Sequence, residues 1–247
     1  MHKFILKQIA AAAVFGMTAA SASAAVVVSI TPAGTPVTNQ GLVSSVPGLA
    51  CQNISFNDAS SLTVFASPTS QCTGVTYTPG SGRAYQSGSV GGQHASPPND
   101  ISVFLTVSPN DEGKSGATPV TITLPTNANY FGFYAASLDP YNFIEFFNGD
   151  TSVGRYSGTE LAALAGLTSA TGDQSRGFYF NVYLNPKDLS ARFDKVVLES
   201  TAYAFETDNH SFGIATPPDA NVPVPGALAL LGIGALGMFG AGRRRAV

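Results

Sequence analysis

The feature that most constrains the fold is a succession of short segments rich in Val, Ile, Thr, Phe and Tyr, separated mostly by Gly, Pro, Asn or Asp. Such segments are typical of β-strands joined by tight turns, and a long series of them is typical of an antiparallel β-sandwich. We therefore predict an all-β fold. The predicted strands cover 26–30, 54–56, 62–66, 75–78, 101–108, 120–124, 130–137, 142–147, 152–156, 178–184, 196–199 and 202–206.

Two connections between the predicted strands have distinctive sequences. Asn148-Gly149 predicts a type I′ hairpin turn, because these residues tolerate the positive φ that both central positions require. This turn would pair 142–147 with 152–156. The longest polar stretch, 79–100, has almost no apolar residue, and we predict a mobile loop there.

One segment has helical periodicity instead. Ser157 and Glu160 have the spacing of a capping box, in which each side chain bonds the other residue's backbone N–H. Leu161, Leu164 and Ala165 then recur at i, i+3 and i+4. We expect a short amphipathic helix, ending near residue 167, that packs over one end of the sandwich.

The C-terminal region predicts a membrane segment. Residues 226–242 are only Gly, Ala, Leu, Ile, Met and Phe, and at ~1.5 Å per residue they give a helix of roughly 25 Å, a short membrane span. The following arginines would hold the C-terminus in the cytoplasm. Two prolines precede the span. The motif residues are Pro223, Val224 and Pro225, and the basic residues are Arg243, Arg244 and Arg245.

The N-terminal region predicts a secretory signal peptide. Lys3 and Lys7 form a basic start, an apolar core follows, and Ala22-Ser23-Ala24 is a small-residue cleavage site for a signal peptidase. The domain organisation that follows is a jelly-roll-like sandwich preceded by a leader and followed by a tail. Its segments are signal peptide 1–24, sandwich domain 25–215, linker and sorting motif 216–225, transmembrane helix 226–242 and basic tail 243–247.

The charge of the body disfavours nucleic acid. The whole chain has a formal net charge of −3, with twelve basic and fifteen acidic residues. Five of the basic residues belong to the two targeting segments, so the body keeps seven and its net charge is −8. Because proteins bind phosphates through an excess of Lys and Arg, we expect no nucleic-acid partner.

The order of the tail, with Pro-x-Pro, a Gly- and Leu-rich helix and terminal arginines, resembles the PEP-CTERM sorting tail of Gram-negative surface proteins. The resemblance implies that an exosortase in the inner membrane cuts near the prolines and releases the body to the cell surface or extracellular matrix, often alongside exopolysaccharide. Val224 stands where the commonest form has Glu, which resembles a Val-Pro-x-Pro variant. A plain C-terminal anchor is the alternative.

Part of the body resembles a family of exosortase-dependent surface proteins whose activity is not assigned. The resemblance runs from about residue 130 to residue 213. Its motifs are Tyr130-Phe131-Gly132-Phe133-Tyr134, Ser137-Leu138-Asp139, Tyr141-Asn142, Phe146-Phe147-Asn148-Gly149, Phe193-Asp194-Lys195-Val196 and Phe205-Glu206-Thr207-Asp208-Asn209.

Few residues in the body indicate chemistry. Cys51 and Cys72 are the only cysteines, and in an exported protein they predict a disulfide. His94 and His210 belong to no catalytic motif and are interpreted as solvated side chains. Residues 111–115 contain the end of a P-loop without its leading glycine and are interpreted as a hairpin turn. Glu145 could be a glycosidase carboxylate, but strand alternation favours an outward, solvated side chain.

Two groups of residues suggest ligands. An outward stripe of Tyr134, Tyr179 and Tyr183 on neighbouring strands could stack on sugar rings, although cross-strand packing is the alternative. The second group could supply oxygen ligands for a structural Ca²⁺ that links the chain ends, although no linear calcium-loop spacing is present. Its members are Asn57, Asp58, Glu206 and Asp208, with Asn209 beside them.

These observations together predict a non-catalytic surface or biofilm-matrix protein. It would pass through the inner membrane, be anchored there transiently, and require no cofactor apart from the possible calcium. A carbohydrate-binding module for exopolysaccharide is the first alternative. A secreted hydrolase is the second alternative, and only isolated carboxylates in the sequence support it.

Overall fold

A computed structural model describes most of the body of the chain. The described residues are 26–30, 34–57, 65–66, 72–80, 85–109, 116–135, 138–170, 172, 174–185 and 191–217. The signal peptide, the sorting motif and the predicted transmembrane helix lie outside this part, as does the segment 111–115. Within the described residues no helix has the length and apolar character needed to cross a membrane.

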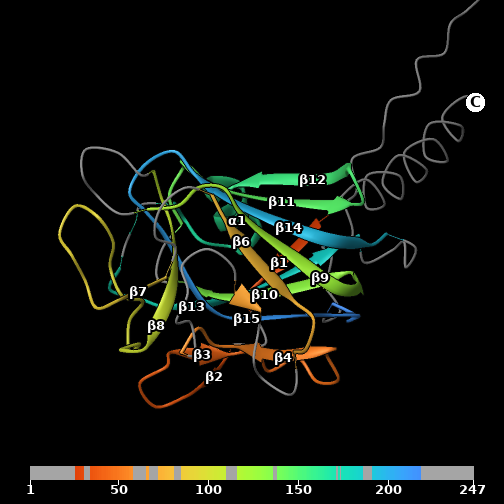
Figure 1. Ribbon diagram of the computed structural model, residues 1–247, viewed down its shortest axis with the longest axis horizontal. Helices are drawn as coiled ribbons and strands as arrows, with labels where there is room; N and C mark the ends of the chain where they lie inside the picture. Colours follow the sequence, from red (N-terminus) through yellow and green to blue (C-terminus); the bar gives the residue numbers. More distant parts are fainter. Residues whose placement is uncertain are drawn as a thin grey trace, which may run out of the picture.

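The described body consists of antiparallel β-sheets and one short helix, in agreement with the predicted β-sandwich (Figure 1). The larger sheet has seven strands, and the sheet that faces it has six. The larger sheet runs β1 (Val26–Ser29), β13 (Phe178–Leu184), β10 (Tyr130–Ala135), β15 (Phe205–Gly213), β8 (Val103–Val107) and β7 (Tyr85–Ser87), and β4 (Cys51–Ile54) also pairs with β15. The other sheet runs β12 (Thr151–Ser157), β11 (Asn142–Asn148), β14 (Phe193–Ser200), β9 (Val120–Ala128), β6 (Thr76–Pro79) and β5 (Phe65–Ala66).

The core lies between these two sheets. Phe131 and Phe133 on β10 and Phe180 on β13 face inward from the larger sheet. Ile144 and Phe146 on β11 face them from the other sheet, and all five side chains are buried. These residues alternate with outward residues along each strand, which is the period-two pattern expected when each sheet has one face on the core.

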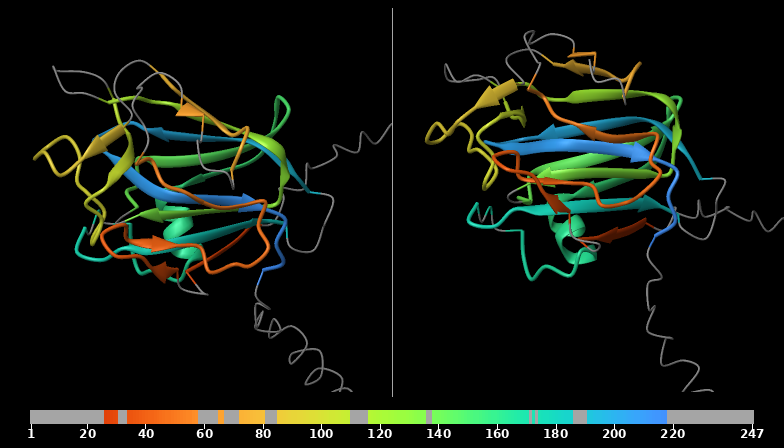
Figure 2. Two further views of the ribbon diagram at one scale, coloured as in Figure 1. Left: turned by 60° about the horizontal axis from the view of Figure 1, so that its bottom comes forward. Right: turned by 90° about the horizontal axis from the view of Figure 1, so that it is seen from below.

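A short hairpin covers the outer face of the larger sheet. It consists of β2 (Thr35–Pro36) and β3 (Leu42–Val43), and β3 contacts β10, β13 and β15. In Figure 2 the chain around this hairpin crosses the larger sheet on the side away from the six-stranded sheet. The larger sheet is therefore covered on both faces.

The central strand of the larger sheet, β15, is the least expected element. The sequence predicted a strand at 202–206, whereas β15 spans Phe205–Gly213 and pairs with β10 on one side and with β8 and β4 on the other. Asn209 and His210 together lie opposite Phe133, which makes a β-bulge, and Asn209 has φ 51°. The extra residue interrupts the alternation along the strand, so that Asp208 and His210 face opposite sides of the sheet.

The predicted hairpin is confirmed, with a shift in its turn. β11 pairs with β12, and Asn148 lies opposite Thr151, so the central residues are Gly149-Asp150. Gly149 has φ 59°, and Asp150 has no positive φ. A positive φ at the first central position alone is typical of a type II′ turn, so the predicted type I′ turn at Asn148-Gly149 is wrong.

The predicted helix is confirmed and ends earlier than expected. α1 spans Gly158–Leu164, with Ser157 as its N-cap. Glu160 N–H donates to Ser157 Oγ, and Ser157 N–H donates to Glu160 Oε2 at 2.7 Å, so both halves of the capping box are present. Leu161 is buried in the core.

The prediction of a mobile loop at 79–100 is wrong for its described part. It contains β7, and Tyr85, His94 and Asp100 are buried. Polar contacts connect it to the rest of the fold: a β-bridge joins Asp100 to Gln40, and Ala95 N–H donates to the Glu206 carboxylate. The low apolar content led to the prediction of a mobile loop, because the sequence does not show hydrogen bonds to a distant strand.

The predicted disulfide between Cys51 and Cys72 is confirmed, with the two Cα atoms 4.9 Å apart. It joins β4, in the larger sheet, to the turn that leads into β6, in the other sheet. The bridge therefore ties the two layers together across a sequence separation of 21 residues.

Removing this bridge should measurably destabilise the body. For Cys51→Ala with Cys72→Ala we expect the free energy of unfolding to fall by about 3 kcal/mol, because the unfolded chain regains the entropy of an open loop. Urea denaturation of the double variant measures the loss. The oxidised and reduced wild-type proteins provide the control pair, and equal midpoints for these two would contradict the expectation.

Candidate functional site

The candidate site is organised by a run of polar residues on the central strand. Glu206 to Ser211 are six consecutive polar residues of β15, and all of them are buried. Burial of polar groups is costly unless they are hydrogen-bonded, so such a run needs partners on both faces of the sheet. Among these side chains, His210 enters the core, whereas Asp208 and Glu206 face the covering loops.

His210 enters the core. Its side chain is fully buried, with Nδ1 2.9 Å from the Tyr77 hydroxyl and Nε2 2.9 Å from Thr207 Oγ1. Phe56 and Phe131 meet the ring edge-on at 5.1 and 5.2 Å. Burial lowers the pKa of His210 to about 3, so the imidazole is neutral. The interpretation of His210 as a solvated residue is therefore wrong.

Asp208 faces the covering loops and lies next to a second buried acid, Asp100. Ser102 Oγ is 2.5 Å from Asp100 Oδ1 and 3.3 Å from Asp208 Oδ2, and Asn209 N–H donates to Asp208 Oδ1 at 2.7 Å. Burial and then the Asp100 carboxylate raise the pKa of Asp208 well above its usual value. The Ser102 hydroxyl therefore links the two carboxyl groups.

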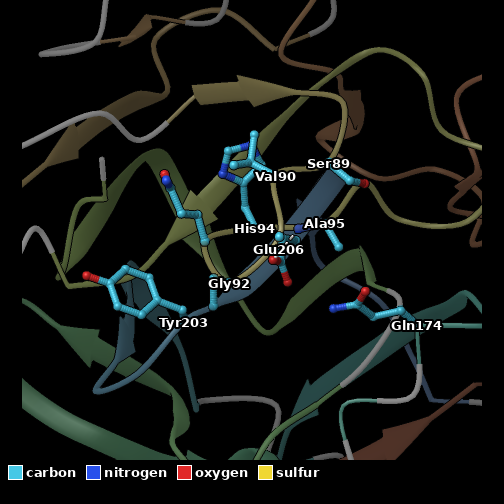
Figure 3. A pocket seen from close by; sticks show the side chains of 11 residues that line it. Ser89, Val90, Gly92, His94, Ala95, Gln174, Tyr203 and Glu206 are labelled. Carbon is cyan, nitrogen blue, oxygen red and sulfur yellow. Dashed lines mark hydrogen bonds between the residues drawn. The ribbon is translucent and has the colours of Figure 1, made fainter. Parts of the chain in front are cut away.

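Glu206 faces the same side but occupies a different place, the pocket in Figure 3. The pocket has a volume of about 300 Å³ and lies between the loop 89–95, the loop before β13 and the start of β15. Ala95 N–H donates to Glu206 Oε1 at 2.8 Å. Burial raises the pKa of Glu206 to about 7, and the nearby Asp139 adds to this effect. The pocket therefore contains a carboxyl group that titrates near neutral pH.

His94 lines the same pocket, but its ring points away from the Glu206 carboxylate and packs against Phe104 at 6.0 Å (Figure 3). The side chain is 8% exposed, and burial lowers its pKa. Nδ1 has no hydrogen-bond partner within the described part of the chain. The interpretation of His94 as a solvated residue is therefore also wrong.

The tyrosine stripe does not form an accessible platform. Tyr134, Tyr179 and Tyr183 lie outside the main core, as strand alternation predicted, yet each is only 1% exposed. The covering segment lies directly over them: a Cβ at Gly41 would lie 2.0 Å from Tyr134, a Cβ at Gly34 would lie 2.7 Å from Tyr179, and Tyr183 clusters with Val46. The glycan platform is therefore wrong, because the sequence did not show that the β2–β3 hairpin would cover this face.

Tyr134 borders a second cavity of about 420 Å³, which the β2–β3 hairpin also lines. Its hydroxyl donates to the Pro98 carbonyl. Side chains at Gly41 or Gly177 would collide with the ring, since a Cβ there would lie 2.0 or 1.9 Å from its atoms. Both glycines are therefore required for the close approach that buries Tyr134.

The predicted calcium ligands are divided among different partners. Glu206 accepts from Ala95, Asp208 contacts Ser102, and Asn57 Oδ1 accepts from Val103 N–H at 3.2 Å. Asp58 lies outside the described residues. Over the ranges that are described, no three His, Cys, Asp or Glu side chains are grouped to hold a metal ion. Calcium binding stays a prediction.

Glu145 lies on the outer face of the six-stranded sheet, as strand alternation indicated. Its carboxylate forms an ion pair with Arg155 at 2.9 Å, and Arg155 reaches Glu199 at 2.6 Å. Ser152 Oγ also donates to Glu145 at 2.6 Å. This arrangement is a cross-strand charge network, which accounts for Glu145 without a catalytic role.

The sequence identified Glu206 and Asp208 but missed Asp100, Ser102 and the loop 89–95 that completes the pocket. No local pattern pointed to the missed residues, because Ala95 lies 111 residues from Glu206 and Ser102 lies 106 residues from Asp208. Comparisons with known proteins found no relative of this chain: no family model, no curated protein sequence and no solved structure matches it.

Proposed function

We propose that this chain is an exported, non-catalytic protein of a bacterial surface or biofilm matrix. The observation that carries the proposal is the Cys51–Cys72 bridge, because disulfides persist in oxidising compartments outside the cytoplasm. The signal-like N-terminus and the tail with its prolines and arginines support the same destination.

The proposal includes a jelly-roll topology for the sandwich. Consecutive strands from β8 to β15 alternate between the sheets, except that β11 and β12 form one hairpin. The resulting orders are β8-β15-β10-β13 in one sheet and β9-β14-β11-β12 in the other. These orders support two interleaved Greek keys, the arrangement found in jelly rolls. Capsid and lectin domains share that architecture, so it supports a binding or structural role without establishing one.

The non-catalytic part of the proposal is supported by how the titratable groups are used. His210 has both ring nitrogens hydrogen-bonded in the core, and the acid pair is joined through Ser102. Glu145 is neutralised by Arg155. General acid–base catalysis requires such groups to reach a substrate, and these groups contact other parts of the fold.

The tail is proposed to be a temporary anchor. A short, Gly-rich span is a weak anchor, and three arginines would hold its end in the cytoplasm. Pro223 and Pro225 then lie at the outer surface, where their missing N–H groups favour an extended chain that a protease can enter. A signal peptidase and an exosortase are the proposed processing partners, and exopolysaccharide is the proposed neighbour at the surface.

Mass spectrometry of the surface-exposed protein from an exosortase-bearing host tests this proposal. We expect the mature chain to lack everything from about Pro225 onward and to begin near Ala25. Replacing Arg243, Arg244 and Arg245 together with Gln should impair processing. Arg176→Gln is the matched control, since Arg176 is an exposed arginine of the body. A mature protein that keeps 243–247 would show a plain anchor.

A further inference from the structure

The pocket around Glu206 has an unbalanced charge. Its lining consists of the loop 89–95, Gln174, Tyr203, Ala204 and Glu206, and contains no Lys or Arg. Figure 3 shows the Gln174 amide turned toward the centre of the pocket, whereas the Tyr203 ring points away from Glu206. The one other titratable nitrogen, that of His94, belongs to a ring whose burial favours the neutral form. Glu206 is therefore the dominant charge of the pocket.

No positively charged side chain of the pocket lining compensates this carboxylate, although the residue is only 4% exposed. Ala95 N–H satisfies Oε1, and no hydrogen bond from another described residue reaches Oε2. Asp139, on the connection between β10 and β11, adds negative potential instead of relieving it. A buried carboxylate in this position gains most from a cation that also donates hydrogen bonds.

We propose that this pocket binds small ligands through a primary ammonium group, with the Glu206 carboxylate as the acceptor. The assignment goes beyond the proposed surface role and does not depend on it. A cavity of about 300 Å³ is at the small end of ligand pockets, which suits a molecule of about the size of one sugar. The ammonium would bond Oε2, and the Gln174 amide and the backbone of 89–95 would contact the rest of the ligand.

Two sources of the ammonium group fit this chemistry, an amino sugar and an alkylamine such as a lysine side chain. Glucosamine, glucose and propylamine separate them. Binding of glucosamine but not glucose identifies the ammonium as the recognised group. If propylamine binds as tightly as glucosamine, the site is assigned to alkylamines. If glucosamine binds more tightly than propylamine, the site is assigned to amino sugars.

Binding should depend on pH in a defined direction. The titratable groups around Glu206 are Asp139, Tyr141, Tyr203 and His94, and none of them supplies a positive charge near neutral pH. Because the pKa of Glu206 is about 7, the carboxyl must lose its proton before it can pair with the cation. Glucosamine affinity should rise by up to about tenfold per pH unit below about pH 7, and binding there should release a proton.

Isothermal titration of the full chain, purified in mild detergent, tests the proposal. Glu206→Gln keeps the shape of the side chain and the bond from Ala95, so we expect it to fold and to bind glucosamine at least about tenfold more weakly. Glu199→Gln is the matched control, since Glu199 lies on the other sheet and pairs with Arg155. It should leave the affinity unchanged.

Proton release by the wild-type protein provides a second measurement that needs no variant. The binding enthalpy below about pH 7 should change with the ionisation enthalpy of the buffer. Equal affinities for glucose and glucosamine would overturn the proposal, as would an unchanged affinity in Glu206→Gln. No detectable binding of either amine at tens of millimolar would overturn it as well.

Discussion

Phe131→Ala is expected to lower the free energy of unfolding by about 4 kcal/mol, because truncation of a fully buried aromatic side chain leaves a cavity in a packed core. The side chain contacts elements of both layers. Its ring lies 5.2 Å from His210 on β15 and 6.5 Å from Phe146 on β11. The loss should therefore be near the upper end of the range for single substitutions.

Urea denaturation measures this effect. Phe143→Ala is the matched control, since Phe143 lies on the outer, partly exposed face of β11 and packs against Arg155. We expect the control to cost about 1 kcal/mol, because a half-exposed ring buries less apolar area. Equal losses for the two variants would contradict the arrangement in which the core lies between the sheets.

Asp208→Asn should gain stability relative to the wild type as the pH rises. The folded-state pKa of Asp208 is raised above its unfolded value, so the fold favours the protonated acid. Its contribution is fully present below the unfolded pKa of about 3.9 and is lost as the pH rises toward the folded pKa. Asn cannot ionise, so the difference should shift in favour of the variant above about pH 4, by up to about 1.4 kcal/mol per pH unit.

Thermal melts or urea titrations between about pH 4 and about pH 7 measure this shift. Asp150→Asn is the matched control, because it makes the same change at a side chain that lies exposed in the turn between β11 and β12. His210 acts in the opposite direction: its lowered pKa makes stability fall as the pH drops below about 6.5, in both proteins. A pH-independent difference between Asp208→Asn and the wild type would contradict the acid pair.

The sequence predicted those strands whose two faces differ. β10, β11 and β13 alternate core residues with others, and each was found within two residues of its true limits. β15 was largely missed because its residues 206–211 are all polar, whereas β-strand prediction depends on apolar alternation. Both faces of β15 are buried, and several of its polar side chains contact residues far away in the sequence, such as Ala95 for Glu206 and Tyr77 for His210.

The same reason explains why the pocket could not be predicted. Glu206 and Ala95 are separated by 111 residues, and Asp208 and Ser102 by 106. The sequence also assigned the tyrosines to the correct side of their strands but could not show that the β2–β3 hairpin would cover them. Alternation predicts the direction of a side chain, and accessibility depends on which segment packs over it.

The position of β15 affects how the chain can fold during synthesis. This strand is the last one of the described body, yet it lies between β10 and β8 in the middle of the larger sheet. Before residues 205–213 emerge from the ribosome, both neighbours present open edges, and the sheet cannot close. A chain with this topology would therefore remain loosely structured until almost the whole body has been synthesised.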